Sequence, residues 1–220
     1  ISSSMGDLEV ISLANNFLKS LKLDNKIELK INSLGDTDSR LNYRKVLVDY
    51  LNDFKKELSE DSIKRLKENP LRILDSKNPS DQAILIKAPD VLNYLNEFSK
   101  DRFEEVCDGL DSLNIDYKID KNLVRGLDYY CHTAFEFITD QLGAQGTVLA
   151  GGRYDGLSEM LGGIQMPGVG WAAGIERLAL MINANYKNNP DLVLIGLSEK
   201  FNLDLLQMID RLIKDGIKTE

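Results

Sequence analysis

Thr147-Val148-Leu149-Ala150-Gly151-Gly152-Arg153-Tyr154-Asp155-Gly156-Leu157 is the stretch that decides the fold of this 220-residue chain. Residues 147–150 predict a short strand that runs directly into a pair of glycines. Glycine lets a ligand approach the backbone closely, and the two amides could donate to a carboxylate. Most of the 16 glycines of the chain lie between Gly126 and Gly174, so we expect the functional part of the protein there.

Strand patterns flank this stretch on both sides. Apolar residues alternate with others over 115–119 and over 129–138, as they do in half-buried strands. Residues 169–172 predict one more strand, and Gly174 opens a helix that carries Leu178, Met181 and Ile182. Separate runs of strand pattern and helix pattern favour the α+β class.

In the first half of the chain, the spacing of apolar residues is mainly that of helices. Residues 7–23 predict an amphipathic helix, 26–31 a strand and 32–35 a turn. From 36 to about 113 the pattern is helical throughout, with Ser59 as an N-cap and with helix starts at Asn78-Pro79 and Ala88-Pro89. We interpret this run as a helical module inserted between strands.

The last part of the chain predicts the beginning of another domain. Residues 183–190 are polar and linker-like, 191–197 predict an apolar strand, and a helix with Leu205, Met208, Ile209 and Leu212 follows. One strand and one helix cannot close a core. We therefore expect the sequence to stop partway into a second, α/β domain.

Composition excludes several classes of protein. The net charge of −8 argues against strong non-specific binding to nucleic acid. Cys107, Cys131 and His132 fall short of a zinc site, and two cysteines do not make a disulfide framework. No segment approaches the ~20 apolar residues that span a bilayer. These features favour a soluble protein of the reducing cytoplasm.

Three segments combine glycines with arginine or tyrosine near the end of a predicted strand: 123–130, 150–157 and 170–178. Arginine offers a planar fork of donors that suits phosphate. Each segment alone also has a purely structural interpretation: a turn with a local Arg125–Asp128 ion pair, a hairpin loop, or a helix start with an exposed charge pair. None is a phosphate-binding Walker loop, and no dinucleotide fingerprint follows a strand.

Taken together and in this order, the segments resemble one family. Arg125-Gly126-Leu127-Asp128-Tyr129-Tyr130 and Ala150-Gly151-Gly152-Arg153-Tyr154-Asp155-Gly156-Leu157 are similar to the two signature segments of histidyl-tRNA synthetases. Gly174-Ile175-Glu176-Arg177-Leu178 resembles motif 3 of class II synthetases, and 69–77 resembles the inserted helical region of the bacterial enzymes. The resemblance implies the antiparallel sheet of a class II catalytic core, activation of histidine with ATP, and transfer of histidine to tRNA(His).

The resemblance also implies a role for each matching residue. Arg125 would lie beside the α-phosphate of ATP and the carboxylate of histidine, and would stabilise the charge that develops as pyrophosphate leaves. Tyr129 and Tyr130 would line the histidine pocket, which requires a bend because neighbours on a strand point to opposite faces.

The remaining roles fall on the two later segments. Gly151, Gly152 and Tyr154 would form the floor and rim of the histidine pocket. Gly174 and Arg177 would bind ATP, and Mg²⁺ would accompany the nucleotide. We interpret His132, Cys131 and Trp171 as structural residues.

The family pattern also implies what lies outside these 220 residues. Motifs 1 and 2 are absent, and the resemblance divides the chain into catalytic core (1–34), helical insertion (35–113), catalytic core (114–185) and the start of an anticodon-binding domain (190–220). We therefore expect a fragment that is inactive by itself and that belongs to a homodimer when complete.

Other interpretations stay open. A non-catalytic paralogue that regulates histidine biosynthesis would share the fold, but would be expected to lose Arg125. A synthetase-like sensor that binds tRNA within a larger regulator is a second alternative, and a purely structural α+β domain is a third. Arg125, Tyr130 and Arg177 weigh against the regulator and the sensor.

Overall fold

The computed structural model describes residues 1–127, 129–143, 146–182 and 190–219. The chain forms two compact units, Ile1–Ile182 and Asn183–Glu220. All of the candidate site residues lie in the first unit. None of the helices in the described ranges is long and apolar enough to cross a membrane.

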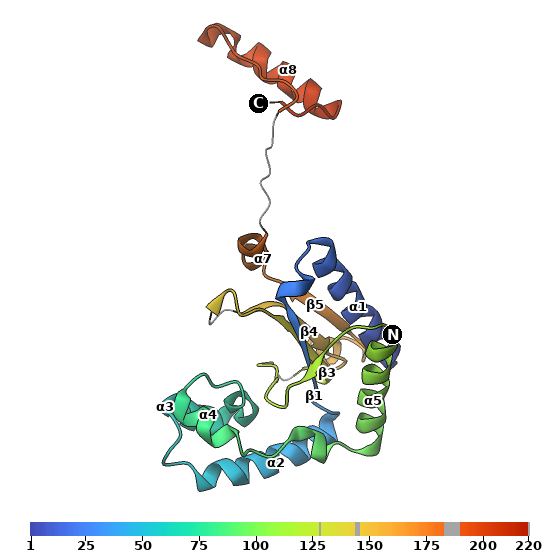
Figure 1. Cartoon of the computed structure of the whole chain (residues 1–220), viewed down its shortest axis with the longest axis vertical. Coiled ribbons are helices and arrows are strands. Elements are labelled where there is room, and N and C mark those ends of the chain that lie inside the picture. The colour runs from blue at the N-terminus through green and yellow to red at the C-terminus, as the bar shows by residue number, and fades with distance from the viewer. Residues whose placement is uncertain (128, 144–145, 183–189, 220) are drawn as a thin grey trace. The chain divides into compact units, whose positions relative to one another are not determined.

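A five-stranded sheet forms the centre of the first unit (Figure 1). Its spatial order is β2-β1-β3-β4-β5. All neighbouring strands are antiparallel except β1 and β2, which are parallel. The strands are β1 (Glu28–Ser33), β2 (Lys118–Ile119), β3 (Cys131–Ile138), β4 (Thr147–Arg153) and β5 (Val169–Ala173). The prediction of an α+β fold with an antiparallel sheet is confirmed.

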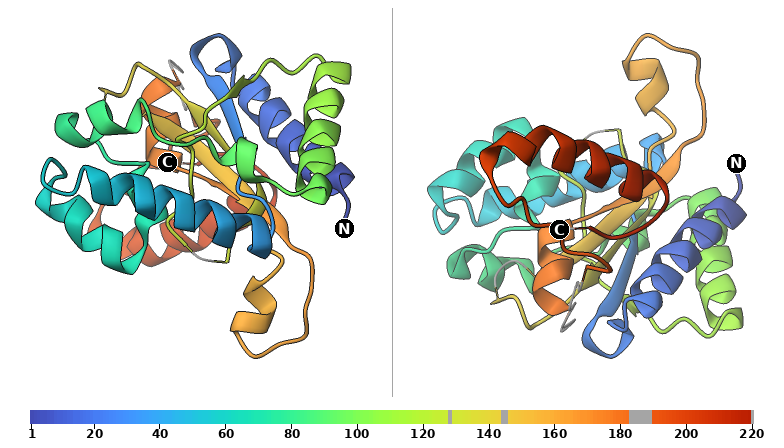
Figure 2. Two further views of the ribbon diagram at one scale, coloured as in Figure 1. Left: turned by 90° about the horizontal axis from the view of Figure 1, so that it is seen from below. Right: turned by 90° about the horizontal axis from the view of Figure 1, so that it is seen from above.

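Helices α1 (Ser4–Ser20) and α5 (Glu97–Ser112) cover one face of this sheet (Figure 2). Successive strand residues point to opposite faces, so Phe135 and Phe137 reach this side together. They pack with Ile11 and Val106 from the two helices, and all four side chains are buried. Burying each such side chain contributes about 1.5–3 kcal/mol, which fixes the helices against the sheet.

The opposite face of the sheet carries small side chains. Ala134 and Gly152 are paired across β3 and β4, and Ala150 is paired with Ala172 across β4 and β5. Ala172 is exposed and Ala150 is half-buried, so this face is shallow and open. The charged residue among these positions is Glu136, which is paired with Ala150. We call this side the open face.

The chain between β1 and β2 is helical, as predicted. It contains α2 (Thr37–Asp53), α3 (Glu60–Glu68), η2 (Pro70–Ile73), α4 (Pro79–Leu85), η3 (Val91–Tyr94) and α5. Helices α2 to α4 close a second apolar core, which includes Tyr43, Leu47, Leu51, Ile73 and Leu85. By contrast, α5 contributes to the core beneath the sheet. The division of the chain at residues 35 and 113 stays a prediction.

Side chains at the helix starts explain why the helices begin where they do. Ser59 accepts a hydrogen bond from the Ser62 amide, and Asn78 accepts one from the Ser80 amide, as the N-cap predictions required. The predicted start at Ala88-Pro89 was wrong by a short distance. Asp90 is the cap of η3 and accepts from the Leu92 amide, because an aspartate satisfies a free amide that proline cannot.

The second unit differs from its predicted pattern in one respect. The helix is present as α8 (Asn202–Lys214), preceded by η5 (Glu199–Phe201). Residues 191–197 do not form a strand, and within the described ranges Leu192 makes only an isolated bridge to Thr219. An apolar run becomes a strand only when neighbouring strands accept its hydrogen bonds, and the described residues 190–219 supply none along 191–197.

Smaller differences concern the ends of elements. The first helix covers Ser4–Ser20 rather than 7–23, and β1 extends through Ser33 into the predicted turn. The turn itself is completed by Gly35, whose φ of +67° favours glycine. Of the predicted strand 115–119, only Lys118–Ile119 pairs with β1.

Candidate functional site on the open face of the sheet

Arg125 lies over the open face, held in a network of hydrogen bonds. Its guanidinium donates to the carbonyls of Phe135 at 2.6 Å and Gly151 at 3.0 Å, and to the Glu136 carboxylate at 2.9 Å. Only 14% of the side chain is exposed. The loop 122–127 therefore presents this arginine in one defined position. A guanidinium held in this way is already placed for an oxyanion, although its present acceptors occupy most of its N–H groups.

A chain of polar contacts links Arg125 to Arg177 across the sheet. Glu136 accepts from Arg125 with one oxygen, and from the Thr147 hydroxyl at 3.1 Å with the other. The Thr147 carbonyl accepts a hydrogen bond from Arg177. Arg177 extends from α7 (Ile175–Met181), which begins at Gly174 as predicted. The two candidate arginines therefore belong to one connected surface.

Three tyrosines meet beside Arg125. The ring centroids of Tyr129 and Tyr130 are 4.9 Å apart, and Tyr154 meets Tyr130 edge to face at 5.9 Å. The Arg125 guanidinium carbon lies 5.8 Å from the centre of the Tyr130 ring. Burial raises the pKa of the Tyr130 phenol, although Arg125 opposes this effect, so the phenol keeps its proton at neutral pH. Together with Arg125, this tyrosine cluster offers a cation, aromatic faces and hydroxyl groups to one small ligand.

Tyr129 and Tyr130 precede β3, which begins at Cys131, so the alternation of side chains along a strand does not apply to them. Their rings lie close together without a bend inside the strand. The register between β3 and β4 shifts just after them, between Cys131 and Ala134, which is a β-bulge. His132 lies in the bulge with φ of +47°.

Gly151 and Gly152 make room within the paired strand β4. A Cβ at Gly152 would lie 2.6 Å from the Thr133 carbonyl oxygen and 3.2 Å from Cδ1 of Tyr130. A Cβ at Gly151 would lie 2.6 Å from Cζ of Phe135. The glycines therefore allow close packing of the strands and of Tyr130. Gly151 and Gly152 are both paired with residues of β3 and of β5. The backbone of this part of β4 therefore lies between two hydrogen-bonded neighbouring strands.

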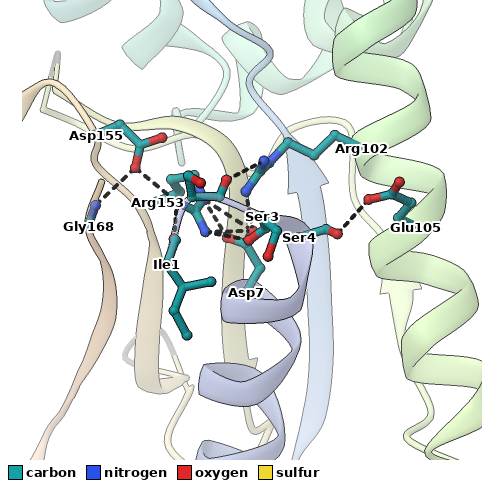
Figure 3. A network of polar contacts seen from close by, with 10 residues as sticks. Ile1, Ser3, Ser4, Asp7, Arg102, Glu105, Arg153, Asp155 and Gly168 are labelled. Atoms are coloured by element: carbon teal, nitrogen blue, oxygen red, sulfur yellow. Dashed lines mark hydrogen bonds and ion pairs between the residues drawn. The ribbon is translucent and has the colours of Figure 1, made fainter. Parts of the chain in front are cut away.

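Arg153 belongs to the same signature segment but points to the opposite side of β4, into a buried network (Figure 3). It donates to both carboxylate oxygens of Asp7, at 3.0 Å and 3.1 Å. Arg102 donates to the same carboxylate at 2.8 Å. Arg153 and Asp7 are both fully buried. The network joins the start of α1, the middle of α5 and the end of β4.

His132 and Cys131 lie next to the tyrosines but make few polar contacts. His132 is 8% exposed and packs edge to face on Phe98, and its Nδ1 has no hydrogen-bond partner in the described part of the chain. Burial lowers the pKa of His132 and raises the pKa of the Cys131 thiol. Both groups are therefore uncharged at neutral pH, which fits the prediction that they are structural.

Trp171 packs on the covered side of the sheet, as predicted. Its ring stacks on Phe17 of α1 at 5.6 Å. Both cysteines, Cys107 and Cys131, are free thiols. No cluster of three or more metal-ligating side chains occurs in the described residues.

Two hollows adjoin these groups. One, of about 850 Å³, lies between the inserted helices and Arg125, and its lining includes Arg72, Gly126 and Glu136. Another, of about 480 Å³, is bordered by Tyr129, Tyr130 and Arg40. The larger hollow, which borders Arg125, is of a size that accommodates a small ligand.

The structure thus brings together Arg125, the three tyrosines and the two glycines, with Arg177 farther along the open face. Asp128 of the first signature segment lies outside the described residues; Arg125 pairs with Glu136, a partner that the sequence analysis did not name. Sequence analysis missed Glu136, although it is the single charge between two phenylalanines of β3. It also missed Asp7, which carries no local signal because its partners are far away in the sequence.

Comparison with known proteins gives a consistent result. The family model described as histidyl-tRNA synthetase matches residues 2–178. A histidine–tRNA ligase of Ehrlichia ruminantium (strain Welgevonden) is 51% identical over 197 residues, which cover 90% of this chain and 48% of the relative. A histidine–tRNA ligase of Rhodospirillum rubrum is 48% identical over 214 residues, which cover 97% of this chain and 52% of the relative. The chain thus spans about half the length of these relatives.

Solved structures agree with the same fold. The apo histidyl-tRNA synthetase of S. aureus matches 100% of this chain and 55% of its own, with a TM-score of 0.70 and 34% identity. A Bacillus halodurans C protein described as an ATP phosphoribosyltransferase regulatory subunit/histidyl-tRNA synthetase matches with a TM-score of 0.56 but 18% identity. At that identity the second match shows the shared fold alone.

Proposed function

Because the chain belongs to the histidyl-tRNA synthetase family, we propose that it forms the part of a histidine–tRNA ligase that binds histidine and activates it with ATP. The reaction would join the histidine carboxylate to the α-phosphate, release pyrophosphate and then transfer histidine to tRNA(His). The observation that carries this proposal is the fixed guanidinium of Arg125 beside the tyrosine cluster.

Arg125 would meet the reacting anions by exchanging some of its present acceptors. Three of its nitrogens donate to carbonyl and carboxylate oxygens in four hydrogen bonds, so most of its N–H groups are engaged in this structure. A histidine carboxylate and an α-phosphate would present the same kind of oxygen and would take over these donors. Charge that develops as the carboxylate attacks phosphorus would then meet a cation that already lies beside the tyrosine cluster.

The tyrosine cluster supports histidine as the amino acid. Tyr129, Tyr130 and Tyr154 can enclose a flat ring, and a protonated phenol can donate to an imidazole nitrogen. Gly152 leaves space for Tyr130 to lie against β4. We propose Gly151 and Gly152 as the floor of this pocket and Tyr154 as its rim.

ATP would extend over the open face towards Arg177. The small side chains of this face, Ala150 and Ala172, leave room for a nucleotide. Mg²⁺ would accompany the nucleotide, since it usually binds through one or two carboxylates together with substrate phosphates. The carboxylate of this face, Glu136, already accepts from Arg125 and Thr147, so the substrate phosphates would supply the main ligands. The ion would neutralise phosphate charge. Gly174 and Arg177 would hold the far end of the nucleotide.

The remaining partners follow from the family. We propose that tRNA(His) delivers its acceptor end to the open face, that the complete protein is a cytoplasmic homodimer, and that residues 190–220 begin an anticodon-binding domain. The regulatory-paralogue alternative is less well supported, because Arg125, Tyr130 and Arg177 are all present and stand on one surface.

Substitution of Arg125 tests the proposal. In the complete protein that contains these residues, Arg125→Met should lower histidine-dependent ATP–pyrophosphate exchange by about 10²–10³-fold. The matched control is Lys77→Met, which removes a positive charge from the same hollow, where Lys77 is 83% exposed. It should retain wild-type exchange.

The amino acid is tested in the same assay. Each of the twenty amino acids is supplied separately to the wild-type protein, and only histidine should support exchange. A wild-type protein that supports no exchange with any amino acid would instead favour the regulatory paralogue. Circular dichroism of the Arg125 variant ensures that lost activity does not reflect lost folding.

A further inference from the structure

Asp155 connects the buried arginine network to the loop beside the tyrosine cluster. One of its carboxylate oxygens, Oδ1, accepts a hydrogen bond from Arg153 at 3.0 Å. The same oxygen accepts from the Gly168 amide at 2.9 Å (Figure 3). Residues 155 and 168 are thirteen positions apart in the chain, so this atom joins the two ends of the loop that contains α6 (Leu157–Met160), beside the backbone hydrogen bond from Tyr154 to Gly168.

The Arg153 side of this connection cannot move easily. Arg153 is fully buried and also donates to Asp7 and to the carbonyls of Ile1 and Ser3. Asp7 is held a second time by Arg102 of α5. An arginine with this many partners acts as a rigid anchor, because each contact restricts the same planar group.

The Gly168 side of the connection determines where the Tyr154 ring can lie. The Tyr154 amide donates to the Gly168 carbonyl at 2.8 Å. A Cβ at Gly168 would lie 2.6 Å from Cε2 of Tyr154, and one at Gly170 would lie 2.7 Å from its hydroxyl oxygen. The ring therefore rests directly on the backbone of 168–170. Any displacement of Gly168 changes the surface against which Tyr154 packs.

We propose that Asp155 is a positioning residue, which latches the loop 156–167 to the buried Arg153 and so fixes Tyr154 at the rim of the histidine pocket. This inference rests on the proposed function of the tyrosine cluster. Asp155 acts through Tyr154 and does not itself contact the substrate. We assign this role to the acceptor oxygen Oδ1, because that one atom receives both hydrogen bonds.

Two substitutions of Asp155 distinguish the effect of its acceptor oxygen from the effect of its negative charge. Asp155→Asn retains an oxygen at the Oδ1 position and can keep both hydrogen bonds, whereas Asp155→Ala removes them. In the complete protein, Asp155→Ala should raise the KM for histidine about tenfold in ATP–pyrophosphate exchange. The KM for ATP and kcat should change less than about twofold, because Arg125 and Arg177 lie outside the latch. Asp155→Asn should restore the KM for histidine.

The matched control is Glu159→Ala, which removes an exposed carboxylate from the same loop. It should leave all three kinetic constants unchanged. The latch also has a readout that needs no activity. Hydrogen–deuterium exchange at the Gly168 amide should speed up in Asp155→Ala, and it should stay slow in Asp155→Asn and in Glu159→Ala.

The outcomes are distinct. Equal KM values for histidine in wild type and Asp155→Ala would overturn the inference, and so would an Asp155→Asn variant as impaired as Asp155→Ala. A parallel loss of kcat and of both KM values would indicate a general structural defect and would also overturn it. Absence of any exchange by the wild-type protein would refute the proposed function, whereas the amide exchange at Gly168 would still decide whether the latch exists.

Discussion

Arg125 and Arg153 show how one residue type serves two purposes in neighbouring signature segments. Arg153 is fully enclosed and is paired with Asp7 beneath the sheet. Arg125 is 14% exposed and lies beside the tyrosine cluster on the open face. The sequence analysis assigned a role to Arg125 and none to Arg153, and it did not reveal the difference between them. That difference depends on Asp7, about 150 positions away from Arg153, which no local pattern reveals.

Substitution of Arg153 should therefore affect stability much more than substitution of Arg125. Arg153→Met leaves the buried Asp7 carboxylate with Arg102 as its remaining cation, and breaking a buried pair in this way costs about 3–5 kcal/mol. Arg125→Met removes the cation from the partly exposed Glu136 and a donor from the carbonyls of Phe135 and Gly151, and should cost about 1–2 kcal/mol. Urea unfolding of both variants measures the difference. Equal losses would contradict the assignment of Arg153 to a structural network.

His132 should make stability depend on pH. Burial lowers its pKa below the ordinary value of 6.5; Arg102 lowers it further, while Asp155, Asp36 and Asp7 oppose the shift. The unfolded chain therefore binds a proton at a higher pH than the folded chain does. The neutral imidazole makes its full contribution to the free energy of unfolding above pH 6.5. This contribution is lost as the pH falls through the lower pKa of the folded state.

The His132→Asn variant tests this dependence. Asparagine tolerates the positive φ at this position and does not titrate. Between pH ~7.5 and pH ~5.5, the urea midpoint of the wild type should fall more steeply than that of the variant. Parallel curves would mean that His132 is solvated in the folded protein and that its pKa is ordinary.

At the scale of elements, local sequence patterns predicted most helices and strands. They did so because the spacing of apolar residues in each element matches the face that the element buries. Leu47 and Leu51, one turn apart on α2, are both buried in the helical module. The strand predicted over 191–197 failed because pairing depends on neighbours that a local pattern does not contain. The β-bulge at His132 escaped prediction for a similar reason, since register is a property of two strands.

The turn between α3 and α4 depends on one buried carboxylate, Asp81. It accepts hydrogen bonds from the Ser59 amide and from the hydroxyls of Ser59, Ser62 and Ser76. Burial tends to raise the pKa of Asp81, but these hydrogen bonds outweigh it and lower the pKa. Asp81→Ala would leave several buried donors without an acceptor, at a cost of about 2–4 kcal/mol.

This loss should be confined to the helical module. Limited proteolysis should cut Asp81→Ala between residues 55 and 80 faster than it cuts the wild type. Asp75→Ala, which removes an exposed carboxylate from the same region, serves as the control. Uniform cleavage along the whole chain of Asp81→Ala would show instead that the module and the sheet unfold as one cooperative unit.

At the scale of the whole molecule, the fold closes one face of the sheet and leaves the other open. Apolar side chains from α1 and α5 complete the covered side, while the open face presents alanines, glycines, Glu136 and two arginines. The sequence indicated this organisation through the signature segments. It did not reveal the polar line from Arg125 through Glu136 and Thr147 to Arg177, because that line joins three separate elements.

The open face leads to the last prediction, which concerns the 220 residues by themselves. Arg125 and Arg177 are the candidate ATP-binding cations on this face, and the relatives are about twice as long as the matched segment. A triphosphate held by so few groups would remain largely solvated, and transition-state stabilisation falls when water competes for the same oxygens. We therefore expect the isolated chain to fold but to show no histidine-dependent pyrophosphate exchange, under conditions in which the complete protein does. Circular dichroism establishes folding of the isolated chain, and exchange above the background of its Arg125→Met variant would contradict the prediction.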